Sequence, residues 1–164
     1  MKFKVTIPYP RAVEDTLAML QDQRFHSIRD RKLSASTSPV QNTSGGFKFT
    51  TSSDVDLQQA PAAVRKLVKG SNLGVQVVEE WDTTAATATT TAEVSGAPVS
   101  LHFTSRLLPA TQGCERVLEG EVKVRIPLVG GAIEKQALGY IYRVKEFEGE
   151  CAQEYWSQEG QENE

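Results

Sequence analysis

The stretch of sequence that decides the fold is Gly120-Glu121-Val122-Lys123-Val124-Arg125-Ile126-Pro127-Leu128-Val129-Gly130-Gly131-Ala132-Ile133-Glu134-Lys135. Residues 121–126 alternate charged and apolar side chains, which is typical of a strand with one buried face. Pro127 ends that strand because proline lacks the N–H that a sheet needs. Gly130 and Gly131 favour a tight turn into a helix. The sequence therefore predicts a strand followed directly by a helix.

The segment after this turn has the spacing of a long amphipathic helix. No proline occurs between Ala132 and about Gln158, and apolar residues recur at i, i+3 and i+4. At ~1.5 Å per residue the helix is roughly 40 Å long, which is enough to cross a sheet. The stripe expected to face inward contains Ile133, Ala137, Tyr140, Ile141, Val144, Phe147, Glu148, Cys151 and Tyr155.

Upstream of this stretch the pattern predicts one strand, two short helices and then a series of hairpin-linked strands. The first strand covers 2–9 and the helices cover 11–21 and 23–33; in the second helix, Phe25, Ile28, Arg29 and Leu33 lie near one face. Pro39 places the 34–43 stretch at a sheet edge, because proline cannot donate to a neighbouring strand. Further strands are expected at 47–53, 73–82, 83–94, 99–108 and 114–126, with a connecting excursion and a helical turn at 57–70.

Alternation within these strands also predicts which side chains share a face. Val75, Val77 and Glu79 lie on one side of their strand, and Val99, Leu101, Phe103 and Ser105 lie on one side of theirs. Val117 and Leu118 interrupt the alternation, so a bulge is expected near Gly120.

The order of elements predicts an α+β domain with a helix-grip architecture. An antiparallel sheet of about six or seven strands would curve around the last helix, leaving a gap in which a ligand fits. We expect a single domain over residues 1–159 and a polar C-terminal tail over 160–164.

Several motifs resemble a known family. The 120–135 run, together with Glu79-Glu80-Trp81 and Gly96-Ala97-Pro98-Val99, resembles the signature of a bacterial family catalogued as domain of unknown function 2505. The order of elements is similar to that of the START-like (SRPBCC, helix-grip) superfamily, which includes birch-pollen allergens and polyketide cyclases. The resemblance implies the fold; it does not imply an activity.

Composition narrows the classes of partner. A net charge of -3 and a pI near 5.5 give no electrostatic reason to expect nucleic acid or an anionic membrane, although a basic patch can lie on an acidic protein. The chain shows no apolar run long enough for a secretory signal or for an integral membrane segment, so we expect a cytoplasmic protein. The sequence does not decide the oligomeric state.

The residues that carry chemistry form no recognisable catalytic or metal-binding constellation. Cys114 and Cys151 are far apart, without a Cys-x-x-Cys pair or clustered histidines, so we expect buried thiols and predict no metal site, disulfide or cofactor. His102 is expected to face solvent, and neither it nor His26 has a nucleophile beside it. Glu134 lies in the first helical turn, where a carboxylate can accept backbone N–H bonds.

Two short features allow both a functional and a structural interpretation. Gly130-Gly131 before a helix could bind an anion, but a tight turn is the simpler interpretation because the Lys-Ser/Thr of a phosphate loop is missing. Glu148 lies on the inward stripe, where an apolar cavity would raise its pKa. A position at the edge of the stripe, in water, is the simpler interpretation.

Together these features predict noncatalytic binding of a small apolar ligand, of a lipid or polyketide-like kind, between the sheet and the last helix. No catalytic residue is assigned. The alternatives are a cyclase- or hydrolase-like enzyme that uses Glu148, and a protein-interaction module whose cavity has collapsed. The residues expected to contact the ligand are Trp81, Phe103, Ile133, Ala137, Tyr140, Ile141, Val144 and Glu148.

Overall fold

The computed structural model describes residues 1–59, 62–66 and 72–162. The remaining part of the predicted 57–70 excursion and the last two residues of the predicted tail lie outside the described residues. The elements in chain order are β1 (Lys2–Tyr9), α1 (Val13–Gln21), α2 (Gln23–Leu33), β2 (Ala35–Thr37), β3 (Gln41–Asn42), β4 (Gly46–Asp56), the 3-10 turn η1 (Leu57–Gln59), α3 (Ala62–Arg65), β5 (Asn72–Asp82), β6 (Thr87–Val94), β7 (Val99–Ala110), β8 (Gly113–Val124) and α4 (Gly130–Glu162).

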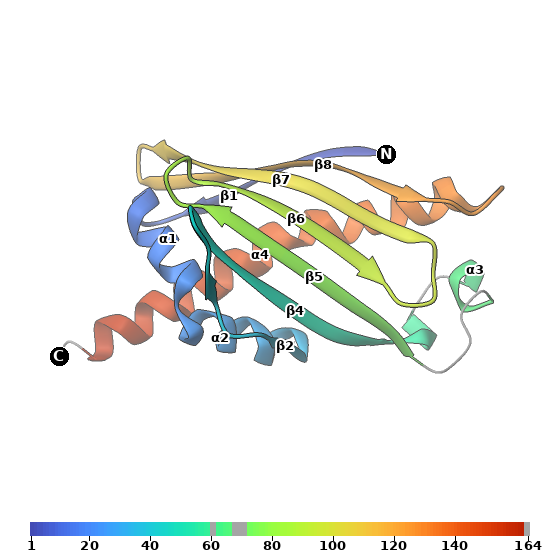
Figure 1. The fold of residues 1–164 in the computed structure, drawn as a ribbon, viewed down its shortest axis with the longest axis horizontal. Helices are drawn as coiled ribbons and strands as arrows, with labels where there is room; N and C mark the ends of the chain where they lie inside the picture. Colours follow the sequence, from blue (N-terminus) through green and yellow to red (C-terminus); the bar gives the residue numbers. More distant parts are fainter. Residues whose placement is uncertain (60–61, 67–71, 163–164) are drawn as a thin grey trace.

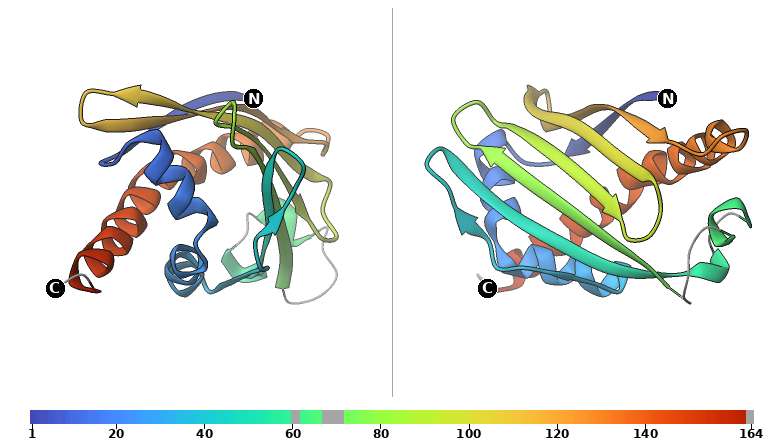
Figure 2. Two further views of the ribbon diagram at one scale, coloured as in Figure 1. Left: turned by 60° about the vertical axis from the view of Figure 1, so that its left-hand side comes forward. Right: turned by 45° about the vertical axis from the view of Figure 1, so that its right-hand side comes forward.

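One antiparallel sheet forms the body of the molecule. Within the described residues it has eight strands in the order β1-β8-β7-β6-β5-β4-β2, with the two-residue strand β3 also paired to β4. From β4 to β8 each strand pairs with the next one in sequence, as hairpins do. The first strand pairs with the last, and Figure 2 shows that the sheet as a whole is strongly curved.

Helices α1, α2 and α4 lie on the concave side of this sheet (Figure 2). Figure 1 shows α1 and α2 at one end of the sheet and α4 running diagonally behind it. Helix α4 packs against β1 and β8 and alongside α2. Helix α2 is tied to the edge strand β2, because the backbone N–H and the hydroxyl of Thr37 both donate to the Asp30 carboxylate, at 2.8 and 2.6 Å. The α+β helix-grip architecture expected from the sequence is confirmed.

Side-chain alternation places the apolar faces as predicted. Strand β1 buries Phe3, Val5, Ile7 and Tyr9 and exposes Lys2 and Lys4. On β7 the side chains of Ser100, His102, Thr104 and Arg106 are exposed, so His102 faces solvent as expected. Together with residues from α1, α2 and α4, these inward side chains build one apolar core.

The predicted bulge near Gly120 is wrong. Strand β8 pairs without interruption with both β1 and β7 through this residue. The inward series is Cys114, Arg116, Leu118, Gly120, Val122 and Val124, so the alternation never changes phase. It looked interrupted in the sequence because an arginine occupies an inward position. Gly120 is needed for space, since a Cβ atom there would lie 2.3 Å from the Cβ of Phe103.

Three further expectations need correction. The 34–43 stretch contributes the two short strands β2 and β3, so the sheet has eight strands within the described residues, where about six or seven were expected. Helix α4 begins at Gly130, so the two glycines form its first turn, and it continues to Glu162 through most of the predicted tail. Leu33 at the end of α2 is 48% exposed and does not share the buried face of that helix.

The junction between β8 and α4 has the close packing that a tight turn requires. The Gly130 N–H donates to the carbonyl of Ile126 at 2.9 Å, and a Cβ at Gly130 would lie 2.5 Å from the carbonyl oxygen of Val124. Glu134 accepts a hydrogen bond from a backbone N–H as expected, but the donor is Val124 of β8, at 3.0 Å, and Glu134 lies beyond the first turn of α4. This hydrogen bond lowers the pKa of Glu134.

Candidate functional site

A buried ion pair lies on the concave face of the sheet. Arg116 on β8 is 3% exposed and Glu79 on β5 is 4% exposed. The arginine Nη2 donates to Oε1 of Glu79 at 2.7 Å, and its Nε donates to the hydroxyl of Ser105 at 3.1 Å. Its guanidinium group also lies over the Trp81 ring, 4.9 Å from the centroid, and Trp81 Nε1 donates to the same Glu79 oxygen at 2.8 Å. The pair is therefore held from three strands.

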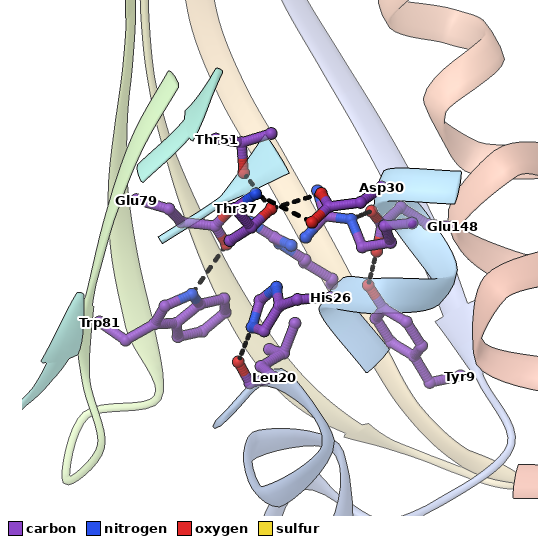
Figure 3. A network of polar contacts seen from close by, with 11 residues as sticks. Tyr9, Leu20, His26, Asp30, Thr37, Thr51, Glu79, Trp81 and Glu148 are labelled. Carbon is purple, nitrogen blue, oxygen red and sulfur yellow. Dashed lines mark hydrogen bonds and ion pairs between the residues drawn. The ribbon is translucent and has the colours of Figure 1, made fainter. Parts of the chain in front are cut away.

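A second ion pair joins the helices to the first strand. Glu148 on α4 is 2% exposed and accepts from the Arg29 Nε of α2 at 3.0 Å and from the Tyr9 hydroxyl of β1 at 3.3 Å. Figure 3 shows Tyr9 and Glu148 pointing toward each other. Glu148 therefore lies inward and not in water at the edge of the stripe, the position that the sequence favoured, and its neighbours are an arginine and a phenol and not an apolar cavity.

The two pairs act on each other and form one ionic network, defined here as Arg29, Glu79, Arg116 and Glu148. Burial alone would raise the pKa of Glu79, but Arg116 and Arg29 outweigh it and lower that pKa below its ordinary value. Burial would likewise lower the pKa of Arg116, whereas Glu79 and Glu148 raise it. The network contains two cations and two carboxylates, so the buried charges balance.

Tyr9 acts in this network as a hydrogen-bond donor. Burial, with a further contribution from Glu148, raises the pKa of its hydroxyl far above the ordinary value. The phenol therefore stays protonated and donates to Glu148. With Arg29 on one carboxylate oxygen and Tyr9 on the other, both oxygens of Glu148 are engaged. Such a carboxylate is poorly placed to accept a proton from a substrate.

His26 is the fully buried histidine beside this network. Its Nε2 lies 2.7 Å from the carbonyl oxygen of Leu20, a contact drawn in Figure 3. A carbonyl can only accept, so Nε2 carries the hydrogen and Nδ1 presents a lone pair. Burial lowers the pKa of His26, and the nearby Arg29 lowers it further. His26 is therefore neutral at physiological pH.

This buried histidine predicts how the fold responds to mild acid. Because the pKa of His26 is lower in the folded chain than its ordinary 6.5, the unfolded chain binds the extra proton below pH 6.5. The free energy of unfolding should fall as the pH decreases below that value, by up to about 1.4 kcal/mol per pH unit. Urea titrations of the wild type and of His26→Phe at a series of pH values measure the free energy of unfolding. In the variant, this free energy should not fall between pH 6.5 and the lower pKa of the folded histidine. His102→Phe, on the solvent side of β7, should keep the pH dependence of the wild type, and equal slopes in all three proteins would contradict the assignment.

The interior contains polar atoms that the fold leaves without partners. Within the part of the chain that the structure describes, three buried side-chain atoms lack a hydrogen-bond partner: Nδ1 of His26, Nη1 of Arg29 and Oγ1 of Thr90. An unpaired buried polar atom costs about 1–3 kcal/mol. Arg29 belongs to the ionic network, and Thr90 pairs with Glu79 in the register of β5 and β6, so two of the three atoms adjoin that network.

An inner apolar patch adjoins the ionic network. Its members point inward yet are only half-buried: Val75 and Val77 on β5, Val94 on β6, Leu101 and Phe103 on β7, and Ala137 and Val144 on α4. The register places Val77, Ala92, Leu101 and Val122 in one row across the sheet, next to the row that contains Glu79 and Phe103. Helix α4 therefore leaves part of the inward apolar surface accessible.

The structure places most of the residues that the sequence predicted as ligand contacts on the inward side of the sheet or of α4. Ile133 and Ile141 are buried on the inward side of α4, Ala137, Val144 and Phe103 belong to the inner apolar patch, and Trp81 and Glu148 lie at the ionic network. Tyr140 does not join them, because its side chain is 54% exposed and packs under the Arg143 guanidinium on the outer side of the helix. Its predicted place on the inward stripe is wrong.

The sequence interpretation missed Arg29, Glu79, Arg116 and Tyr9 as members of a polar site. A signal was present for two of them, since Arg29 and Glu79 had been placed on apolar faces by helical and strand spacing. Charged residues of opposite sign on apolar faces are the pattern that indicates a buried ion pair.

The cysteines behave as expected. Both Cys114 and Cys151 are buried free thiols. Burial, and for Cys151 also Glu148, raises the pKa of both thiols, that of Cys151 to about 11. Since the thiolate is the reactive form, neither is suited to nucleophilic chemistry.

Solved structures show the same fold. A protein from Thermus thermophilus is 15% identical and superposes with a TM-score of 0.59, over 94% of this chain and 97% of the other. A START superfamily protein from Mycobacterium smegmatis is 13% identical with a TM-score of 0.53, over 93% and 97%. The Zhui aromatase/cyclase from a Streptomyces species is 9% identical with a TM-score of 0.52, over 93% and 89%. At these identities the likeness establishes the fold and leaves the activity open.

The sequence itself matches a protein family, and its helices can be compared with the requirements of a membrane span. The sequence matches none of the curated proteins. Among the described residues, no helix combines the length and the apolar character that crossing a membrane would need. The model of a family described as a protein of unknown function, DUF2505, matches residues 4–155. With this match and a START-like, helix-grip fold, the chain belongs to the DUF2505 family.

Proposed function

We propose that this protein binds a small apolar ligand, of a lipid or polyketide-like kind, between the concave face of the sheet and the N-terminal half of α4, and that it does so without catalysis. The observation that supports this proposal is the inner apolar patch, whose inward-facing side chains are left half-buried. Burying apolar surface stabilises a complex by about 25 cal/mol per Å² removed from water. A ligand that covers the patch would supply the burial that α4 does not.

The ionic network supports a binding role over a catalytic one. Glu148 is the carboxylate that an enzyme of this fold would be expected to use, yet Arg29 and Tyr9 occupy its two oxygens. Together with Tyr9, the network instead links α2 and α4 to the sheet and holds the helices at a fixed distance from it. Such a rigid frame preorganises a binding site, which reduces the entropy lost when a ligand binds.

The proposal predicts opposite results for two neighbouring residues of β5. Val77 points inward and is half-buried, whereas Val78 points outward and is 38% exposed. Val77→Trp should fill the site and weaken binding of the neutral apolar dye Nile red by about tenfold or more, because the indole occupies the space of the ligand. Val78→Trp adds the same indole on the opposite face and should bind the dye as the wild type does.

Fluorescence titration measures both affinities, and thermal unfolding checks that each variant is folded. Native mass spectrometry and solvent extraction of gently purified protein then identify any retained compound. A wild-type protein that carries no compound and does not bind Nile red would refute the proposed function. Equal effects of the two substitutions would place binding outside the inner apolar patch.

A further inference from the structure

The connection between β8 and α4 carries an apolar side chain that is fully exposed to solvent. Leu128 has a relative exposure of 105%, so its whole side chain lies in solvent. Figure 1 shows this connection projecting beyond the end of the sheet, away from α1 and α2. Isolated exposed leucines are common on protein surfaces, but they seldom occupy a projecting tip.

Hydrogen bonds on both sides hold this tip in place. The Gly130 N–H donates to the carbonyl of Ile126 at 2.9 Å and closes a turn around Leu128. On the strand side, the Arg125 N–H donates to the carbonyl of Pro98 at 3.2 Å. Leu128 has a φ of 71°, a left-handed conformation that a residue with a branched side chain rarely adopts. Strained conformations that the surrounding structure enforces are typical of binding sites.

The segment that carries this tip is basic, although the chain as a whole is acidic. Residues 123–145 contain five cationic side chains and one carboxylate and so carry a net charge of +4, whereas the whole chain carries -3. The carboxylate, Glu134, is turned inward to the Val124 N–H. All five cations are exposed: Lys123, Arg125, Lys135, Arg143 and Lys145.

The charge changes sign along α4. Its C-terminal half, residues 146–159, contains five glutamates and neither lysine nor arginine. The basic half also exposes aromatic side chains: Tyr142 is 54% exposed and lies seven residues after Lys135, on the same face of the helix. Exposed tyrosines and cations, which here follow the apolar tip along α4, are among the side chains that proteins place at a membrane–water interface.

We propose that this basic end, with Leu128 at its tip, docks reversibly on the surface of an anionic lipid bilayer. The leucine side chain would enter the headgroup region, while Arg125 and Lys135 stay in water beside the lipid phosphates. A protein partner fits the surface less well, because a stable interface needs roughly 800 Å² of complementary surface on each side and this end offers a narrow projection. This inference does not depend on the proposed function, since docking uses the outer side of α4 and needs no bound ligand.

Cosedimentation with vesicles tests the proposal. The wild type should bind vesicles of phosphatidylcholine that contain about one third phosphatidylglycerol, and binding should weaken about tenfold or more in high salt, which screens the surface charge. Vesicles of phosphatidylcholine alone should bind little protein. Equal binding to the two kinds of vesicle, or no binding to either, would overturn the proposal.

Variants distinguish the contribution of Leu128 to vesicle binding from the contribution of the exposed cations. Leu128→Ser should weaken vesicle binding about tenfold, because it removes the apolar group that enters the headgroup region. Arg125→Glu combined with Lys135→Glu should abolish it. Both variants change exposed side chains, and thermal unfolding confirms that they remain folded. The matched controls are Leu108→Ser and Arg106→Glu near the other end of β7, where Leu108 is 40% exposed.

The controls should bind as the wild type does, and an equal loss in them would overturn the proposal. Light scattering measures the oligomeric state of the wild type and of Leu128→Ser. A dimer that Leu128→Ser converts to a monomer would show that a second copy of the chain occupies this end, and would also overturn the proposal.

Discussion

Replacing Arg116 by methionine should lower the free energy of unfolding by about 3–5 kcal/mol, because Glu79 would be left as a buried carboxylate without its closest cation. The arginine is 3% exposed and donates to Glu79 and to Ser105. The loss of its position over Trp81 adds to the effect. Urea unfolding followed by tryptophan fluorescence and by circular dichroism measures the change.

A second substitution distinguishes a charge effect from a packing effect. If the unpaired carboxylate causes the loss, combining Arg116→Met with Glu79→Gln should restore a large part of the stability, because the buried charge is gone and the Trp81 N–H keeps an acceptor. Arg106→Met on the solvent side of β7 should change stability by no more than about 0.5 kcal/mol. A double variant no more stable than Arg116→Met alone would attribute the loss to packing.

Gly120→Ala should destabilise the fold by about 3 kcal/mol, although alanine adds a single methyl group. The new Cβ would lie 2.3 Å from the Cβ of Phe103 and 2.5 Å from the carbonyl oxygen of His102. Both β1 and β7 pair with β8 at this residue, so the backbone cannot shift without disturbing two ladders. The Phe3 and Phe103 rings, 5.8 Å apart in an edge-to-face arrangement, would also have to separate.

A glycine in α4 provides a control of opposite sign. A Cβ at Gly139 would meet nothing within 4 Å, and its exposed position is helical. Gly139→Ala should therefore stabilise the protein by about 0.5–1 kcal/mol, the difference in helix propensity between the two residues. Differential scanning calorimetry of the two variants and the wild type measures whether Gly120→Ala lowers the stability and Gly139→Ala raises it. Two destabilised variants would contradict the assignment of Gly120 as the sterically restricted site.

Much of the fold could be predicted from the sequence because its strands alternate strictly. Val75, Val77 and Glu79 share a face in the structure, and Leu101 and Phe103 do so on β7, as expected. The long helix was predictable from its apolar stripe. Tyr140 was misplaced because an aromatic residue at the edge of a wide stripe satisfies the same spacing whether it packs inward or outward.

The ionic network could not be predicted in full because its members are distant in sequence. Arg29, Glu79, Arg116 and Glu148 come from α2, β5, β8 and α4. Only the register of β8 between β1 and β7 places Arg116 inward, and that register is a property of the whole sheet. An arginine in a strand is usually exposed, so nothing in the local sequence indicates that Arg116 points inward.

The pairing of β1 with β8 has a consequence for how the protein is made. Lys2 pairs with Glu121 and Tyr9 with Cys114, so the first strand to leave the ribosome has no partner until most of the chain has followed it. During that interval Phe3, Val5 and Ile7 form an unpaired apolar edge, a kind of segment that favours aggregation. The flanking Lys2 and Lys4 would then protect the nascent chain by repelling other copies. Closing a loop of this length also makes the joining of the two ends a late and slow event in folding.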